Sequence, residues 1–401
     1  MQNKTHEFQM LLFGVALVSV ASLLTNVGLA NVFGSSKFGE YSYVLLLGMI
    51  IGQIIVFGSD QYAVKFHFDH ARSDVASKIF VFRIINFLIV SIAVMTWSLV
   101  ENNHVIPYAL IVASQVLGIP YSYEISGKNV RCAVINVVEK FLYHAAIWVG
   151  IFFFEDSSFI FVFGVLLFWT IVSLVYQFID RSIRLTSMSM PDRSMFTFGF
   201  WLLIFGLTKQ MYGTGTRLFV EHNLGFSALA VYSLVWQVVP LVSTFLEQGV
   251  KSWRVKITSS IVLLDIVTLK NSIKQMTISM IIPVLLGAIV MNLLGREVIS
   301  YILPPEYEPM TLLLPWLGLY VVIVALDVVV SVIWIAIGKI KIFNFLYFGL
   351  SVACFCLLYY FGSDFEMEEY LFTVVIFHGA AVLASACITT RLLIIIVKES
   401  V

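Results

Sequence analysis

The chain has 401 residues, of which 60% are hydrophobic and only 12% are charged, and its 24 basic and 24 acidic residues cancel. A soluble domain carries about 25% charged residues, so this composition excludes a soluble globular protein. The apolar residues fall in blocks of about 20, which is the length a helix needs to cross ~30 Å of hydrocarbon. The sequence therefore predicts an all-α polytopic membrane protein.

The apolar blocks predict twelve transmembrane helices joined by short polar segments. The longest outward loop covers 295–309. The longest inward segment, 250–274, is basic and carries an apolar stripe that includes Ile257 and Ile261. Two interpretations of this stripe stay open, a helix along the membrane surface and a solvated connector. The predicted spans are 8–33, 41–60, 79–100, 106–125, 135–154, 159–179, 195–219, 228–249, 275–294, 310–337, 342–361 and 370–390.

The orientation of the chain follows from its Lys and Arg residues, because basic residues near span ends resist translocation. Most of the 24 basic residues fall on the N-terminal side of the membrane. The opposite side holds Lys37, Arg296 and, at the edge of a span, Arg217, while Lys209 lies in mid-span. We therefore expect both termini in the cytoplasm.

A short polar hairpin occurs twice, 191 residues apart. The stretch VFGSSKFGEYSYV at 32–44 shares Gly, Ser, Tyr, Ser and Val in register with NLGFSALAVYSLV at 223–235. These identities gather in the turn between two spans, which favours duplication of a six-span unit into two parallel halves, as in transporters. We predict an N-terminal six-helix lobe, 1–190, and a C-terminal six-helix lobe, 191–401. Gly34 and Gly225 should tolerate added bulk poorly if the turn requires positive φ or a close helix approach.

The hairpin FGSSKFGEYSY, which follows a first span without an acid, is similar to the first hairpin of a known transporter family, and GFSALAVYS is similar to its span 7–8 turn. With twelve spans and very small loops, the whole chain resembles the polysaccharide-biosynthesis (O-antigen, Wzx-type) flippases of the multidrug/oligosaccharidyl-lipid/polysaccharide exporter superfamily. The chain departs from the family at Asn26, where members often carry a basic residue.

The resemblance implies a flippase, not an enzyme, in the bacterial inner membrane. Its substrate would be an undecaprenyl-pyrophosphate-linked oligosaccharide, an O-antigen or similar repeat unit, moved from the inner to the outer leaflet by alternating access. A coupling ion, H+ or Na+, would drive the cycle. The implied partners are membrane lipid, a glycan polymerase and a chain-length regulator, with no nucleic acid and no cofactor.

Such a substrate needs cations for its pyrophosphate, and span 7 offers two. Lys209, Gly213 and Arg217 recur every four residues, which places them along one helix face. A Lys at the centre of a span costs about 2.5–3.5 kcal/mol on insertion scales and usually faces the bundle interior or water. We expect Lys209 and Arg217 to bind pyrophosphate, although Arg217 also suits a role as a residue that reaches the outer interface.

Asp327 is the only acid deep in a predicted span, and two interpretations of it stay open. It suits an ion-coupling residue, or a buried partner that neutralises Lys209. His378 in span 12 is expected to pack. Further expectations concern polar residues of the cavity, Asn26, Gln53, Asn86 and Gln210, and of its cytoplasmic mouth, Asp60, Lys65 and Arg83.

Other functions and sites were weighed on the residues they require. A drug/cation antiporter of the same superfamily would want an acid inside its first spans, which have none before Asp60. A membrane glycan polymerase would need a large outward loop. The cysteines and the pair His67 and His70 do not predict a metal site.

Overall fold

The fold is described from a computed structural model of the chain, which covers residues 2–59, 75–118, 129–153, 158–180, 190–191, 193–263, 265–337 and 340–399. Across these residues the chain is helical and contains no strand. Eight stretches of the described chain are long and apolar enough to cross a membrane by length and composition. Two of them, Leu17–Val56 and Met195–Leu246, each contain a kink where the sequence predicts a turn between two spans.

The remaining expected spans also fall on helices. The shorter apolar helix Ile106–Leu117 lies within predicted span 106–125, and the helix Asn129–Phe153 covers most of 135–154. Every predicted span thus overlaps a helix of the described chain, and the expected all-α polytopic fold is confirmed.

The chain divides into two compact units. Unit 1 comprises Met1–Phe33 and Glu40–Gln210, and unit 2 comprises Gly34–Gly39 and Met211–Val401. The chain therefore passes between the units three times, after Phe33, after Gly39 and after Gln210. The boundary at 190/191, which was inferred from the sequence repeat, stays a prediction.

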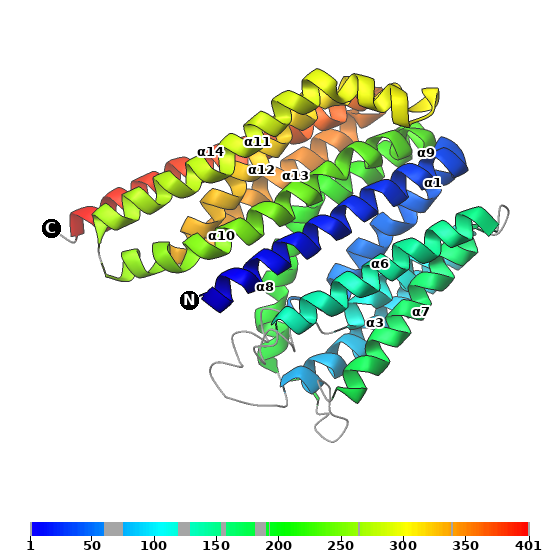
Figure 1. Cartoon of the computed structure of the whole chain (residues 1–401), viewed down its shortest axis with the longest axis horizontal. Coiled ribbons are helices and arrows are strands. Elements are labelled where there is room, and N and C mark those ends of the chain that lie inside the picture. Colours follow the sequence, from blue (N-terminus) through cyan, green and yellow to red (C-terminus); the bar gives the residue numbers. More distant parts are fainter. Residues whose placement is uncertain are drawn as a thin grey trace. The chain divides into compact units, whose positions relative to one another are not determined.

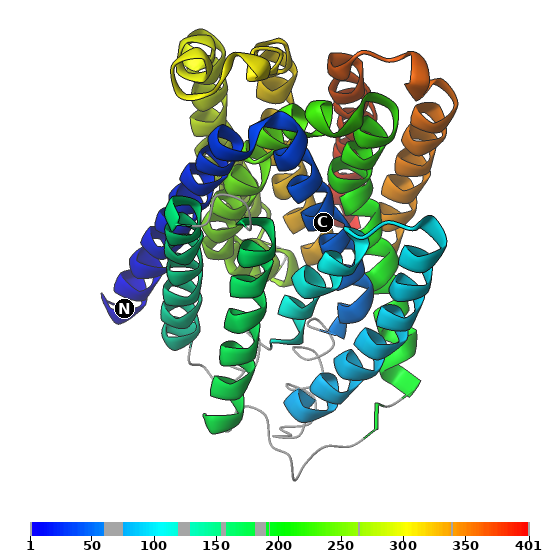
Figure 2. The ribbon, with the colours of Figure 1, turned by 90° about the vertical axis from the view of Figure 1, so that its right-hand side faces the viewer.

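Unit 1 is built from the first helices of the chain (Figure 1). Val75, Ile79, Phe80 and Phe82 of α3 form a buried cluster with Met195 of α8. Figure 2 shows α1 turning back on itself part-way along its length. The elements are α1 (Gln2–Val56), α3 (Val75–Glu101), α4 (Ile106–Ser114), η1 (Gln115–Leu117), α6 (Asn129–Phe153), α7 (Ser158–Ile179) and α8 (Arg193–Gln210).

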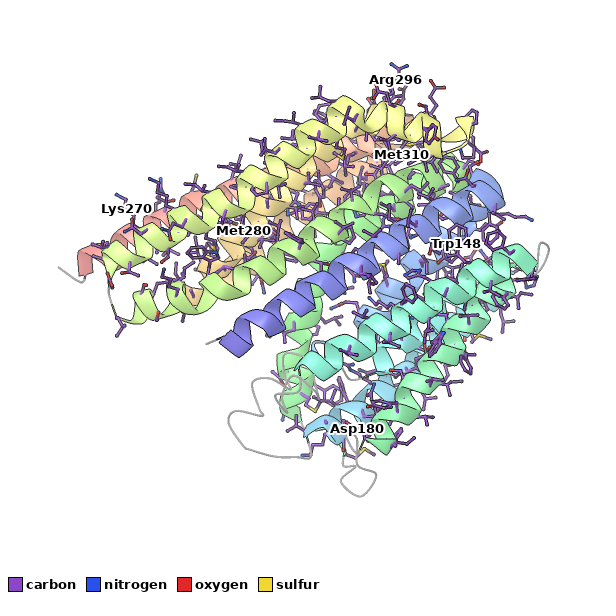
Figure 3. All side chains as sticks on the ribbon, in the orientation of Figure 1. Trp148, Asp180, Lys270, Met280, Arg296 and Met310 are labelled. Carbon is purple, nitrogen blue, oxygen red and sulfur yellow. The ribbon has the colours of Figure 1, made fainter. Side chains whose placement is uncertain are left out.

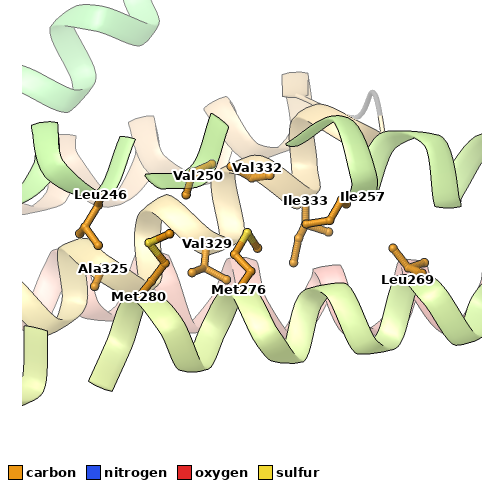
Figure 4. Packing of buried hydrophobic residues seen from close by; sticks show 10 residues of the cluster. All are labelled: Leu246, Val250, Ile257, Leu269, Met276, Met280, Ala325, Val329, Val332 and Ile333. Atoms are coloured by element: carbon orange, nitrogen blue, oxygen red, sulfur yellow. The ribbon is translucent and has the colours of Figure 1, made fainter. Parts of the chain in front are cut away.

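Unit 2 contains the longest continuous helix after α1, α11, which runs beside α10 and α12 (Figure 1). Figure 4 shows Met276 and Met280 of α11 directed toward Ala325 and Val329 of α12, in a cluster that also includes Leu246 of α10. The elements are η3 (Met211–Gly215), α9 (Thr216–Trp236), α10 (Val238–Val262), α11 (Ile266–Ile302), η4 (Pro305–Tyr307), α12 (Met310–Ile337), α13 (Ile340–Phe361), η5 (Gly362–Asp364) and α14 (Met367–Glu399).

The two hairpin glycines have the same backbone conformation. Gly34 interrupts α1 at φ 71° and ψ 174°, and Gly225 interrupts α9 at φ 82° and ψ 179°. This region of backbone space is populated almost only by glycine, because a Cβ atom clashes there. Positive φ, one of the two conditions for poor tolerance of added bulk, is met at both positions, and the poor tolerance itself stays a prediction. The shared torsion supports the inference that the hairpin was duplicated.

The inward segment 250–274 is largely helical. It consists of the end of α10 and the start of α11, which are separated by three residues. Ile257 is fully buried, and Ile261 packs against the same cluster, so both face the protein core. Asp265 begins α11 as its N-cap, because its side chain accepts a hydrogen bond from the Thr268 amide at 3.0 Å. The burial of Ile257 contradicts a fully solvated connector, and a position along the membrane surface stays a prediction.

Candidate functional site

A cluster of buried polar side chains in unit 2 surrounds Asp327, in the middle of α12. Its carboxylate is buried, with 6% of the residue exposed. The Tyr347 hydroxyl, from α13, donates a short hydrogen bond to Oδ1, and the Ser331 hydroxyl, one turn along α12, lies 3.4 Å from the same oxygen. A buried carboxylate is stable only when such partners replace the water it has lost.

His378 of α14 faces the other carboxylate oxygen. Its Nε2 lies 3.9 Å from Asp327 Oδ2, and its Nδ1 lies 3.1 Å from the Tyr320 hydroxyl of α12. The imidazole is also stacked on the Tyr212 ring of η3, at 4.8 Å between ring centroids and 9° between planes. We call Asp327, Tyr347, His378 and Tyr320 the Asp327 cluster.

The helical periods explain why these groups meet. Tyr320 and Asp327 are seven residues apart on α12, so they lie two turns apart on one face. This face packs against α14, and α13 packs against α14 as well. Tyr347 and His378 are thereby brought to the same carboxylate. All four side chains are buried, so the arrangement can hold or release a proton away from bulk water.

Arg217 lies near this cluster in the same unit, at the start of α9. Its Nε donates a hydrogen bond to the Gly213 carbonyl at 3.3 Å, and its guanidinium lies 5.8 Å from the Trp236 ring centroid. The Trp236 ring is in turn 4.9 Å from the Tyr320 ring. An aromatic series therefore connects Arg217 to the Asp327 cluster.

A π-helical turn, η3, precedes Arg217 in span 7. Such a turn shifts backbone hydrogen bonds out of the α-helical pattern and often occurs at functional sites. Thr216 Oγ1 donates to the Tyr212 carbonyl at 3.1 Å, so one carbonyl of the π-turn accepts a hydrogen bond from a side chain of the next turn. The even four-residue spacing from Lys209 to Arg217 therefore does not run through a regular α-helix, contrary to the sequence-based expectation.

The expected pyrophosphate-binding residues lie in different units. Lys209 is exposed at the end of α8 in unit 1, and Arg217 is half-buried in unit 2. Gln210 follows Lys209, and its side-chain oxygen is buried without a hydrogen-bond partner among the described residues.

The remaining predicted cavity residues belong to unit 1. Asn86 Nδ2 donates to the Ile55 carbonyl at 3.1 Å, which joins α3 to α1. The Gln53 side chain lies directly against Gly206 of α8, so it packs between helices. Asn26 is half-buried in the first half of α1.

Of the residues expected at the cytoplasmic mouth, Asp60 and Lys65 lie outside the described residues. Arg83 is almost fully buried, with 1% exposed. Its Nε donates to Ser59 Oγ at 2.9 Å, and its Nη1 donates to the carbonyls of Val116 and Gly118 at 2.6 and 3.0 Å. These bonds give Arg83 a structural role at the end of η1.

Three residues of the Asp327 cluster were missed as functional candidates by the sequence reasoning. His378 was expected to pack, whereas Tyr320 and Tyr347 attracted no notice among the chain's 17 tyrosines. An ionisable residue within a span is a functional candidate by default, and this signal applied to His378. No pattern along the chain pairs it with Asp327. No group of three or more His, Cys, Asp or Glu residues that could hold a metal occurs in the part of the chain that the structure describes.

Comparison with known proteins identifies the fold. No family model and no curated protein matches the chain. A multidrug resistance MATE family transporter of the MOP superfamily, solved in an inward-facing conformation, is similar with a TM-score of 0.70 and 13% identity over 98% of this chain and 96% of that one. The eukaryotic MATE transporter AtDTX14 has a TM-score of 0.61 and 12% identity over 100% and 99%.

A third structure, a MOP superfamily transporter from Pyrococcus furiosus, has a TM-score of 0.62 and 12% identity over 97% of this chain and 96% of that chain. Its binding pocket is described as having reversed polarity, which suggests a different function for that protein. At sequence identities of 12–13%, similarity over the full length shows that the fold is alike. The chain is a multi-pass membrane protein with the all-helical fold of the MATE transporters of the MOP superfamily.

Proposed function

We propose that the chain is an ion-coupled membrane exporter that works by alternating access, with Asp327 as its ion-coupling residue. The observation that carries the proposal is the buried Asp327 carboxylate, which is held by Tyr347 and faced by His378 within apolar helices. An ionisable group at this depth is expensive to keep and is usually retained for transport. The likeness to MATE transporters over nearly the whole chain supports the same class of activity.

The first candidate substrate is a small amphipathic organic molecule, exported in exchange for a cation. The fold favours this candidate, because two of the similar structures are named as multidrug resistance transporters. A fold by itself does not define a substrate, so the proposal depends on a transport measurement.

The test uses cells that lack their own drug exporters and accumulate a fluorescent organic cation such as ethidium. The wild-type chain should lower dye accumulation while an ion gradient is present, and Asp327→Asn should abolish this effect at an equal protein level. Asp364→Asn is the matched control, because it makes the same substitution at an exposed position in η5. If the wild-type chain transports neither dye nor the second candidate substrate, the proposed function is wrong.

The second candidate is the lipid-linked oligosaccharide flippase. Arg217, half-buried beside Trp236, favours it, because a cation within a span suits a pyrophosphate. The duplicated hairpin glycines and the acid-free first span support it as well. In this case the chain would act in the bacterial inner membrane with both termini in the cytoplasm, next to a glycan polymerase and a chain-length regulator.

Surface glycan in a strain that lacks its own flippase tests the second candidate. Lys209→Arg should retain some export, and Lys209→Ala should abolish it without loss of folded protein, because positive charge is what a pyrophosphate needs. If Lys209 only balances Asp327, the double change Lys209→Met with Asp327→Leu should restore both protein level and export. If the wild-type chain restores surface glycan, the flippase is the correct candidate. If it exports dye without restoring glycan, the antiporter is correct.

The orientation stays part of the proposal. Lys270 and Arg296 lie near opposite ends of α11 (Figure 3), with an apolar stretch between them. This arrangement suits a helix that crosses the membrane and keeps its charged residues at the two interfaces.

A further inference from the structure

The Asp327 cluster presents two titratable groups to each other instead of one. Tyr347 and Ser331 approach Oδ1 of the carboxylate, whereas Oδ2 is faced by the imidazole Nε2 of His378 at 3.9 Å. The other imidazole nitrogen, Nδ1, is 3.1 Å from the Tyr320 hydroxyl. Each ring nitrogen therefore has a polar neighbour, and a hydroxyl on Nδ1 fixes the orientation of the ring.

Groups that face His378 come from three of the elements packed around α14, and a fourth, α9, carries Arg217 at its start. α12 contributes Asp327 and Tyr320, and α13 contributes Tyr347, whose ring centroid lies 6.0 Å from the imidazole. η3 contributes Tyr212, which stacks on the imidazole. Asp327 is the acid of this set, and a carboxylate stabilises the protonated form of an adjacent imidazole.

The groups that approach the Asp327 carboxylate are hydroxyl donors and an imidazole. Hard cations take several oxygen ligands around one centre. Here Oδ1 of Asp327 accepts hydrogen bonds from hydroxyl groups, and Nε2 of His378 lies 3.9 Å from Oδ2. An imidazole, by contrast, gains and loses a proton between about pH 5 and 8.

We propose that Asp327 and His378 bind a single proton as a pair, so that the ion coupled at this cluster is H+ and not Na+. This inference rests on the proposed function, because it names the ion for the same site. Without the extra proton, the carboxylate and a neutral imidazole carry a net charge of −1. Binding one proton from water gives either imidazolium with carboxylate or imidazole with carboxylic acid, and both have a net charge of zero. Release of that proton to water on the other side restores the first state.

The charge change gives the pair a means to bias conformation. A net charge that is buried away from water is costly, whereas a neutral pair is tolerated. The charged form therefore favours a conformation in which water reaches the pair, and the neutral form favours one in which it stays buried. An ion shifts such an equilibrium only by the difference in its affinity for the two conformations, and proton binding supplies this difference.

The test is nuclear magnetic resonance of the purified full chain in lipid nanodiscs, with histidines labelled with carbon-13 and nitrogen-15. His378→Gln identifies the His378 signal among the seven histidines. In the wild-type chain this signal should move as the pH is varied. The movement should be altered in Asp327→Asn, and replacing KCl by NaCl at constant pH should leave the signal in place. The signal of His222, which is exposed on α9, is the internal control and should be the same in both proteins.

Two results would overturn the inference. Movement of the His378 signal on adding Na+ at constant pH would identify a sodium site, and the same pH response in wild type and Asp327→Asn would show that the two groups do not act together. If Asp327→Asn does not fold, Asp327→Glu replaces it, because it keeps the charge and moves the carboxylate relative to Nε2 of His378. An unaltered His378 response in Asp327→Glu would also contradict the proposal.

The outcome is separable from that of the proposed function. If the chain transports dye or glycan but His378 does not show the expected response, only the inference about the proton pair is wrong. If His378 shows the response but the chain transports neither substrate, only the proposed function is wrong.

Discussion

Gly225 gives a direct test of the duplicated hairpin, because replacing it by Ala adds a single Cβ atom at a backbone torsion that disfavours one. At φ 82° and ψ 179°, a residue with a Cβ is strained by about 1–3 kcal/mol. A Cβ built at Gly225 meets no heavy atom within 4 Å, so this penalty is not mixed with a steric clash. We therefore expect Gly225→Ala to lower the free energy of unfolding of unit 2 by about 1–3 kcal/mol.

Gly287 supplies the matched control. It lies inside α11, and a Cβ built there also meets nothing within 4 Å. Gly→Ala in a helix interior raises the free energy of unfolding by about 1 kcal/mol. Gly287→Ala should therefore be more stable than Gly225→Ala by about 2–4 kcal/mol. For a unit of about 200 residues, each kcal/mol shifts the thermal midpoint by about 2–4 °C.

The assay heats each purified full-length variant in one detergent and measures the fraction that stays monodisperse on size exclusion. Gly225→Ala should unfold about 4–16 °C below Gly287→Ala. Gly34→Ala should behave like Gly225→Ala, because Gly34 has φ 71° and a Cβ there makes only an ordinary 3.5 Å contact with Glu306. Equal midpoints for Gly225→Ala and Gly287→Ala would refute the argument from positive φ.

Three further predictions rest on single contacts. Arg83→Met should destabilise unit 1 by about 2–4 kcal/mol, because it leaves the carbonyls of Val116 and Gly118 without their donor, whereas Met at the exposed Arg296 should change the thermal midpoint little. Glu306 accepts hydrogen bonds from the Ser35 amide at 2.8 Å and the Ser35 hydroxyl at 3.1 Å, so Glu306→Ala should lower the free energy of unfolding by about 0.5–1 kcal/mol and Glu306→Gln by less. Identical thermal midpoints for both variants and wild type would argue against a contribution from these hydrogen bonds. The hydrogen bonds from Thr268 hold the pKa of the exposed Asp265 below its usual value. The stabilisation that Asp265 contributes is therefore complete above about pH 4 and declines as the pH falls further. The difference in thermal midpoint between wild type and Asp265→Asn should shrink on acidification and not on raising the pH.

The sequence predicted the fold well, because its strongest signals are local. An apolar block of about 20 residues defines a span without reference to the rest of the chain. The repeated Gly34 and Gly225 likewise marked two turns that need the same unusual torsion. The packing of the inward segment was not predicted, because its charged residues resemble those of a loop, whereas Ile257 and Leu269 are buried together across a helical hairpin.

The candidate site was only partly predictable, because it depends on which helices pack together. Asp327 stood out as an acid in an apolar span. Its pairing with His378 depends on the packing of α14 against α12, and no spacing along the chain encodes that contact. Arg83 was also misjudged from the sequence, because a basic residue near a span end resembles an interfacial charge. The sequence does not show whether its side chain reaches water or, as here, binds buried carbonyl groups.

The three passages of the chain between the units have a mechanical consequence. If the units move as rigid bodies, the change in backbone torsion must be absorbed near residues 33/34, 39/40 and 210/211. The first two passages adjoin Gly34 and Gly39, and the third adjoins the π-helical turn Met211–Gly215. Glycines and an irregular helical turn are the places in a helical protein where torsions change most readily. Span 7 would then act as a hinge, and stiffening its π-turn would slow any movement of one unit against the other.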